Sequence, residues 1–130
     1  MDVYQGGEVE LGVLGTGRMG SRIAAMFARA GRRVVLGSRD SDRAAAVVEK
    51  LDIPTLSSGC YSDALAAPAI LPAIFIRDGL FDVLDRKCHM LAGKLLIDIS
   101  NPFNADYSDF VTAWDTSGAE ELQHRFPQTC

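Results

Sequence analysis

One short glycine-rich segment constrains the fold of this chain more than any other feature of its sequence. Residues 13–22 read VLGTGRMGSR, in which Gly15, Gly17 and Gly20 have the spacing G-x-G-x-x-G. A short apolar run precedes the glycines, and apolar residues recur at helical spacing after them. A glycine turn between a buried strand and an amphipathic helix is typical of domains that bind the phosphates of a dinucleotide.

Each glycine is expected to have its own physical role. Gly15 permits the tight turn, Gly17 lets a pyrophosphate approach the backbone, and Gly20 lets the helix pack closely on the strand. The helix N-terminus then offers free N–H groups and a partial positive charge to the phosphates. A merely structural turn is the alternative interpretation, because this spacing alone is a weak signal.

The rest of the chain alternates between strand and helix patterns. We expect strands at residues 9–14, 33–36, 53–56, 70–76 and 95–99, and helices at residues 19–30, 44–51, 62–67 and 80–91. A last helix begins near Ser117, which forms a capping-box pattern with Glu120, and carries Leu122 and Phe126. Strands separated by helices predict an α/β fold with a doubly wound parallel sheet and right-handed crossovers, the Rossmann type.

Two of the expected elements carry specific packing predictions. Pro72 is awkward within the fourth strand, because proline cannot donate to a central ladder, and part of that strand is therefore expected to be irregular. The first helix is expected to pack on the sheet through one apolar face, which comprises Met19, Ile23, Met26, Phe27 and Ala30.

Length, composition and charge exclude several other classes of protein. At 130 residues, with 48% hydrophobic and 23% charged residues, the chain is expected to form a single domain over residues 1–130. The net charge is -4 and the basic residues are scattered, so nucleic acid is a poor partner. The N-terminus, MDVYQGGEVE, lacks a basic start followed by an apolar run, and no run of about 18 apolar residues occurs, so we expect a cytoplasmic chain without a membrane segment.

Cysteine and histidine spacing gives no support to a metal site. Cys60, Cys88 and Cys130 are far apart and form no C-x-x-C pair. Neither His89 nor His124 has other ligands at metal-site spacing. We therefore expect free thiols and no bound metal.

The end of the second strand favours one nicotinamide dinucleotide over the other. NAD sites place an acid there to bind the ribose 2′-hydroxyl, whereas NADP sites need donors and cations for a 2′-phosphate. Here the strand ends in Gly37, Ser38 and Arg39. A hydroxyl and a guanidinium suit a dianionic phosphate, because arginine forms paired, charge-assisted hydrogen bonds with it. The pattern predicts that the chain binds NADP(H).

Asp40 leaves the NAD interpretation open, because its distance from the glycines is also close to that of an NAD-type acid. We place Asp40 one turn too late for that contact and expect it to cap the following helix. Thr16, Arg18 and Arg43 are near enough in sequence to assist at the phosphate. Ordinary loop residues at this strand end are the remaining alternative.

Two longer segments resemble known families. The segment VLGTGRMGSRIAAMFARAGRRVVLGSRD is similar to the start of the NADP oxidoreductases that use the deazaflavin coenzyme F-420. It also resembles the NADPH-binding domain of the six-transmembrane epithelial antigen of prostate metalloreductases, which shares the G-T-G fingerprint and the G-S-R strand end. The similarity continues through IFIRDGLFDVLDRKCHMLAGKLLIDISNPFN, of which the D-I-S-N end is the most telling part, and spans about Val9 to Pro127.

The resemblance implies roles for further residues by matched position. The 2′-phosphate would be held by Thr16, Ser38 and Arg39. The pyrophosphate would meet the backbone of Arg18 and Met19. Residues at the ends of the fourth and fifth strands would line the edge of the cofactor and the nicotinamide end, namely Ile76 and Arg77, and Ser100, Asn101 and Pro102.

The resemblance also implies a reaction. Hydride would pass between NADP(H) and a flavin or deazaflavin, which requires positioning of two rings and no catalytic acid or base, so we assign no catalytic residue. The alternatives are a non-catalytic NADP(H)-binding or sensing module and the cofactor domain of an imine reductase such as pyrroline-carboxylate reductase. These families continue with another strand, so we expect the sheet to lack its last strand or strands, and the open edge favours a homodimer.

Overall fold

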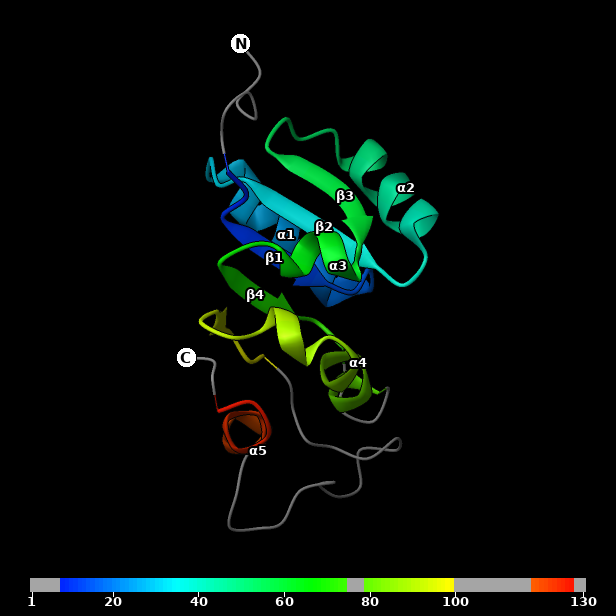
Figure 1. Ribbon diagram of the computed structural model, residues 1–130. Helices are drawn as coiled ribbons and strands as arrows, with labels where there is room; N and C mark the ends of the chain where they lie inside the picture. The colour runs from blue at the N-terminus through cyan, green and yellow to red at the C-terminus, as the bar shows by residue number, and fades with distance from the viewer. Residues whose placement is uncertain (1–7, 75–78, 100–117, 128–130) are drawn as a thin grey trace.

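The computed structural model of this chain describes residues 8–74, 79–99 and 118–127. Within these residues, five parallel strands form one sheet in the order β3-β2-β1-β4-β5. The strands are β1 (Leu11–Leu14), β2 (Val34–Ser38), β3 (Leu56–Cys60), β4 (Ala69–Pro72) and β5 (Leu95–Leu96) (Figure 1). The chain starts in the middle of the sheet, moves outward to β3, and then returns to the other side of β1.

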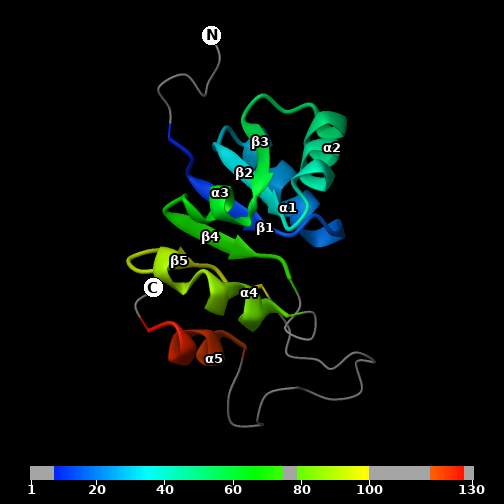
Figure 2. The ribbon, with the colours of Figure 1, turned by 45° about the vertical axis from the view of Figure 1, so that its right-hand side comes forward.

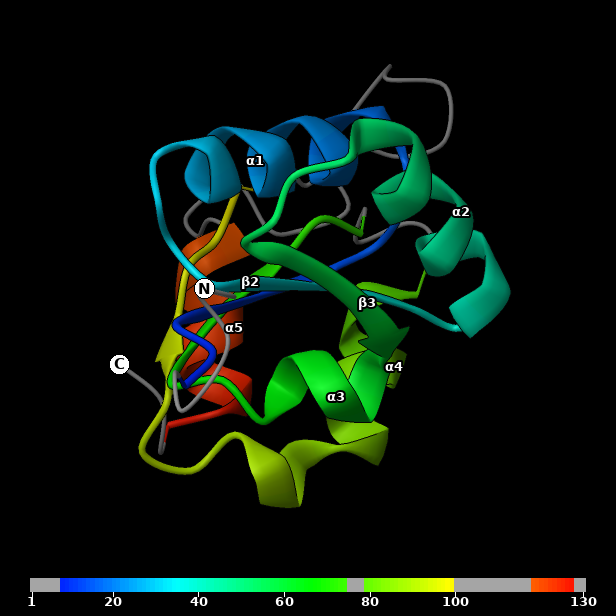
Figure 3. The same cartoon turned by 90° about the horizontal axis from the view of Figure 1, so that it is seen from above.

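Helices cover both faces of this sheet. They are α1 (Arg18–Arg29), α2 (Ser41–Leu51), α3 (Tyr61–Leu65), α4 (Leu80–Arg86) and α5 (Gly118–Arg125), with a 3-10 turn, η2 (Cys88–Met90). Figure 3 shows α1 and α2 on one face and α3, α4 and α5 on the other. The predicted doubly wound parallel α/β sheet is therefore confirmed. None of the helices in the described part of the chain is both long and apolar enough to cross a membrane.

The two central strands carry the core. Every residue of β1 and β2 is buried, because helices cover both sides of them. Val34 and Leu36 pack into one hydrophobic cluster with α1, while Val35 between them packs into a second cluster with α3 and α4. A strand that is buried on both faces has a continuous apolar sequence, which is why both strands could be predicted from the sequence.

The face of α1 that meets the sheet consists of small residues. Its buried residues are Gly20, Ala24, Ala25 and Ala28. The prediction of a larger apolar face is wrong for Met19 and Met26, which are each 59% exposed, and for Ala30, which is also exposed. Ile23 and Phe27 are half-buried against the core cluster of β2. Small side chains let the helix approach the sheet closely, so the larger ones lie at the sides of the contact.

Strand β3 begins where its predicted counterpart ends, so the prediction of a strand over residues 53–56 is wrong. Helix α2 closes at Asp52, which has a left-handed backbone with φ 51°, and the chain needs residues 53–55 to turn back. The strand itself, LSSGC, is mostly half-buried because it forms the edge of the sheet. An edge strand exposes one side to solvent, so its sequence lacks the apolar run that marked β1 and β2.

Strand β4 ends at Pro72, so the predicted strand over residues 70–76 is too long. The Ile97 N–H donates to the Ile70 carbonyl at 2.8 Å. In the other direction, the Ala73 N–H donates to the Leu14 carbonyl at 2.7 Å. Because these directions alternate along a strand, the Pro72 nitrogen faces β5 and has no proton to donate. The β4–β5 ladder stops there, and β5 has 2 residues where the sequence predicted residues 95–99.

The predicted helix over residues 80–91 is divided, since α4 ends at Arg86 and η2 follows it. Figures 1 and 2 both show α5 beside α4, where the Arg125 guanidinium lies 4.4 Å from the centroid of the Phe81 ring. The last helix was predicted to carry Leu122 and Phe126; Leu122 lies in α5 and Phe126 directly follows it, and both side chains join the same core cluster as α3 and α4. The predicted cap, Ser117, lies outside the described residues.

Candidate functional site

The glycine turn joins the carboxyl end of β1 to the N-terminus of α1. Gly15 has φ 109°, a left-handed conformation, and a Cβ there would lie 2.8 Å from the Ala73 carbonyl oxygen. At Gly20 a Cβ would lie 2.2 Å from the Gly15 carbonyl oxygen, so only glycine allows α1 to pack this closely. The Ser21 hydroxyl donates to the Thr16 carbonyl at 3.0 Å and holds the turn between the two glycines.

Gly17 differs from the other two glycines because open space surrounds it. It is the N-cap residue of α1, and a Cβ there would have no atom within 4 Å. No side chain caps this end of the helix. The first N–H groups of α1 therefore lack a side-chain acceptor at a place where a ligand can approach the backbone. Phosphate oxygens fit such a helix end in both geometry and charge.

The carboxyl end of β2 lies beside this turn. The Gly15 N–H donates to the Gly37 carbonyl at 2.8 Å, which brings the two strand ends together. Ser38 is the last residue of β2 and is 6% exposed. Its hydroxyl oxygen accepts a hydrogen bond from the Asp40 N–H at 3.2 Å. Because a serine hydroxyl can accept and donate at once, its proton stays available for a ligand oxygen.

Asp40 caps α2, as predicted. One carboxylate oxygen, Oδ1, accepts a hydrogen bond from the Asp42 N–H at 3.0 Å, and the Asp40 backbone is extended, as expected of an N-cap residue. The carboxylate is thus used to stabilise the start of α2. This use weakens the NAD interpretation, in which the same group would accept hydrogen bonds from the ribose.

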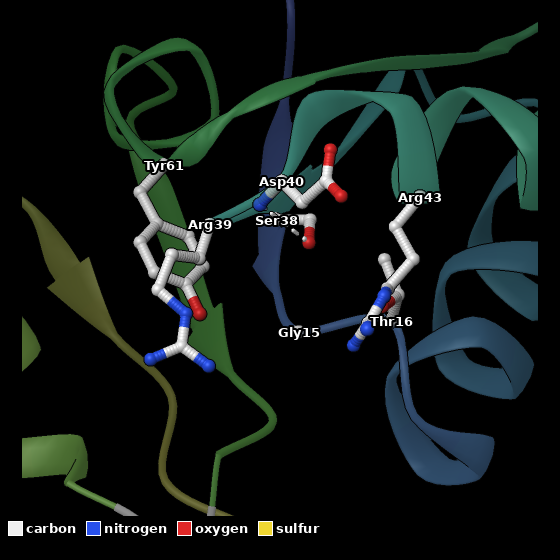
Figure 4. A pocket seen from close by; sticks show the side chains of 7 residues that line it. All are labelled: Gly15, Thr16, Ser38, Arg39, Asp40, Arg43 and Tyr61. Carbon is white, nitrogen blue, oxygen red and sulfur yellow. Dashed lines mark hydrogen bonds between the residues drawn. The ribbon is translucent and has the colours of Figure 1, made fainter.

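Between the two strand ends lies a pocket of about 170 Å³ (Figure 4). In the view of Figure 4, Arg43 from the first turn of α2 lies beside Thr16 at one end, and Arg39 and Tyr61 lie at the other end. Ser38 and the backbone of Gly15 lie between the two ends. The described residues that line it are Gly15, Thr16, Ser38, Arg39, Asp40, Arg43 and Tyr61.

The pocket is rich in donors and positive charge. Neither Arg39 nor Arg43 has an ion-pair partner among the residues that the structure describes. Asp40 is the one acidic residue of the lining, and it is engaged with α2. Two guanidinium groups without an ion-pair partner in the described part of the chain, beside the hydroxyl groups of Thr16 and Ser38, make a suitable setting for a dianionic phosphate. The residues present therefore fit the phosphorylated ribose of NADP(H).

The structure brings together part of the predicted site. Gly15, Thr16, Ser38, Arg39 and Arg43 line the pocket. Gly17, Arg18, Met19 and Gly20 do not line it; they form the adjoining N-terminus of α1. The residues predicted for the edge of the cofactor, Ile76 and Arg77, lie outside the described residues, and so do those predicted for the nicotinamide end, Ser100, Asn101 and Pro102.

Tyr61 lines the pocket and was missed by the sequence analysis. It is the first residue of α3 and directly follows β3. With the third strand placed at residues 53–56, Tyr61 was several residues away from any strand end. A correct strand over Leu56–Cys60 would have put Tyr61 at the same edge of the sheet as Ser38.

The start of α3, at the rim of the pocket, is fixed by a carboxylate. Asp63 accepts a hydrogen bond from the Cys60 N–H at 2.9 Å and another from the Cys60 thiol at 3.2 Å. The hydrogen bond from the Cys60 N–H, and to a smaller extent the one from the Cys60 thiol, lowers the pKa of Asp63 below its ordinary value of 3.8. The charged form of Asp63 therefore holds the turn from β3 into α3.

Replacing Asp63 by alanine is expected to lower the free energy of unfolding by about 0.5–1 kcal/mol near neutral pH, a usual cost for a lost helix cap. Because the folded pKa is depressed, this contribution is present above the unfolded value of 3.8 and is lost as pH falls through the folded pKa. Denaturant unfolding at about pH 7 and about pH 2.5 measures it. Glu49→Ala, at an exposed position of α2, is the control, and a difference that stays constant into acid would contradict the assignment.

Comparisons with known proteins identify the family of this chain. The family model described as NADP oxidoreductase, coenzyme F420-dependent, matches residues 10–102. Rat metalloreductase STEAP3 is 30% identical over 117 residues, which cover 89% of this chain and 20% of that protein. Mouse metalloreductase STEAP2 is 30% identical over 122 residues, which cover 94% of this chain and 23% of that protein. The chain thus spans about a fifth of the length of these relatives.

A solved structure with a similar fold comes from Arthrobacter sp. FB24 and is described as a candidate F420-dependent NADP-reductase. The two share a TM-score of 0.78 and 25% sequence identity, over 94% of this chain and 60% of the other. The match to the family model covers most of this chain and includes the glycine turn and the end of β2. The chain belongs to the coenzyme F420-dependent NADP oxidoreductase family.

Proposed function

We propose that this chain binds NADP(H) between the glycine turn and the end of β2 and presents the nicotinamide for hydride exchange with a flavin or deazaflavin. The observation that carries the proposal is the pocket in which Ser38, Arg39 and Arg43 meet the turn after β1. Asp40, the group that would favour NAD, caps α2 instead.

The 2′-phosphate is proposed to lie in this pocket. The Ser38 hydroxyl donates to one phosphate oxygen, and the Thr16 hydroxyl, which lies at the Arg43 end of the pocket in Figure 4, donates to a second. Arg39 and Arg43 supply the balancing positive charge, and each can form charge-assisted hydrogen bonds. A ribose with a free 2′-hydroxyl leaves both cations without a partner, so NADP(H) is favoured over NAD(H).

The pyrophosphate is proposed to lie over Gly17. The space around Gly17 is open, and the helix that starts there has 12 residues, long enough for a substantial dipole. The backbone N–H groups of Arg18 and Met19 then donate to phosphate oxygens. The exposure of the Met19 side chain is consistent with this, because the residue contributes backbone rather than packing.

The nicotinamide end is proposed to lie near the residues that follow β4 and β5. In open α/β sheets, ligands bind outside the carboxyl ends of the strands, at the point where the strand order reverses. Here that point lies between β1 and β4. We propose that Ile76 and Arg77 line the edge of the cofactor and that Ser100, Asn101 and Pro102 lie close to the nicotinamide.

The reaction places few chemical demands on the protein. When bound, the reduced nicotinamide supplies a hydride, that is, a proton with two electrons, to an electron-deficient ring of the acceptor. The chain must hold the two rings in register and exclude competing reactions, which needs no acid or base from a side chain. The family description and the Arthrobacter relative support a deazaflavin as the acceptor.

The experiment that tests this proposal is a titration with NADPH followed by addition of acceptors. We expect saturable NADPH binding, and oxidation of NADPH only after a flavin or deazaflavin is added. Loss of the absorbance of reduced nicotinamide measures the turnover. Binding without turnover for any acceptor would instead support a cofactor-binding module. Absence of binding would reject the proposed site altogether.

A further inference from the structure

Tyr61 offers the pocket a flat apolar surface. Among the described residues that line the pocket, it alone has an aromatic side chain. Its place at the pocket follows from the sheet, because Cys60 pairs with Ser38 in the β2–β3 ladder and Tyr61 is the next residue. In Figure 4 the ring lies at the same end of the pocket as Arg39, away from Arg43 and Thr16.

Packing against the core fixes the position of the Tyr61 ring. Tyr61 is half-buried and packs against the core cluster that contains Ala64 and Leu65 of the same helix. Helix α3 is seated directly on β1, since a Cβ on Gly12 would lie 1.9 Å from the Ala64 carbonyl oxygen. The hydrogen bonds from Cys60 to Asp63 fix the start of the helix. A ring held in this way loses little conformational entropy when a ligand packs on it.

Ligand geometry connects this ring with the phosphate. In a 2′-phosphorylated nucleoside, the base and the phosphate are attached to neighbouring carbons of the ribose. A phosphate held between Ser38 and the two arginines therefore places the base at the edge of the same pocket. The end beside Thr16 and Arg43 is polar, so the end with Tyr61 is the apolar surface within reach.

We propose that Tyr61 is a specificity-determining residue, against whose ring the adenine base of the cofactor stacks. This inference rests on the proposed function and deepens it, because it makes the site selective for an aromatic base in addition to a phosphate. The ring face supplies the interaction, as in other sites where bases stack on aromatic side chains, and the phenolic hydroxyl is not required.

The test compares Tyr61→Phe, which keeps the ring, with Tyr61→Leu, which keeps apolar volume against the core but removes aromaticity. The probe is adenosine 2′,5′-bisphosphate, which has the base and the 2′-phosphate without the nicotinamide. We expect the dissociation constant of Tyr61→Phe to stay within about twofold of the unmodified chain and that of Tyr61→Leu to rise about tenfold. Thermal unfolding of both variants verifies that they fold.

A second readout reports contact rather than stability. In the unmodified chain, NMR should detect magnetisation transfer between the Tyr61 ring protons and the adenine H2 or H8 proton of the bisphosphate. Equal affinity of Tyr61→Leu and Tyr61→Phe, or a loss in both, overturns the stacking role while leaving the proposed function intact. Failure of the unmodified chain to bind the bisphosphate overturns the proposed function, and this inference with it.

Discussion

Replacing Arg39 by alanine is expected to weaken NADPH binding by about 1.5–3 kcal/mol, the usual range for a hydrogen bond to a charged group. This corresponds to an increase of about 10- to 150-fold in the dissociation constant. NADH binding should change little, because NADH has no 2′-phosphate for the guanidinium to meet. Calorimetric titration of both cofactors against the same preparation measures the two effects.

The matched control for this variant is Arg22→Ala. Arg22 lies on α1, is exposed, and lines a different part of the surface, between α1 and α2. The control removes the same charge from the chain without touching the pocket, so it corrects for long-range electrostatics. NADH that binds the unmodified chain as tightly as NADPH does would contradict the assignment of Ser38 and Arg39.

The central part of the fold was predictable because all residues of its two central strands must be buried. β1 and β2 lie between two layers of helices, so every side chain in them must be apolar or small. The glycine turn could also be predicted from the sequence, because α1 lies so close to Gly15 that there is no space for a Cβ at Gly20. The cap at Asp40 followed from the known preference of helix N-termini for a short acidic side chain.

The wrong predictions have a common cause: the local sequence pattern of a strand or helix does not show which other elements it packs against. β3 is an edge strand and β5 faces a proline, so neither contains the apolar run or the length that buried strands have. The burial of Met19 and Met26 was predicted wrongly for the same reason. Only small side chains, alanine and glycine, fit where α1 packs closely on the sheet, so the two methionines are exposed. At the site, misplacing β3 concealed Tyr61.

Changing Gly20 or Gly17 of the turn to alanine is expected to have different effects: Gly20→Ala should mainly lower the stability of the fold, and Gly17→Ala should mainly weaken NADPH binding. In Gly20→Ala, the new Cβ would lie 2.2 Å from the Gly15 carbonyl oxygen, so α1 must move away from the turn. Forcing an extra carbon into so tight a contact should lower the free energy of unfolding by about 3 kcal/mol. In Gly17→Ala, the Cβ meets nothing within 4 Å and φ is -67°, so the loss should stay below about 1 kcal/mol.

Cofactor binding is expected to respond in a different way. The methyl group of Gly17→Ala would occupy the open space over the first N–H groups of α1, where we place the pyrophosphate. The folded variant should therefore bind NADPH at least about tenfold more weakly, as when one hydrogen bond to a charged group is lost. Denaturant midpoints together with NADPH dissociation constants for both variants distinguish the two effects. If Gly17→Ala bound NADPH with unchanged affinity, the phosphates could not lie at this turn, and its glycine spacing would serve the packing of α1 alone.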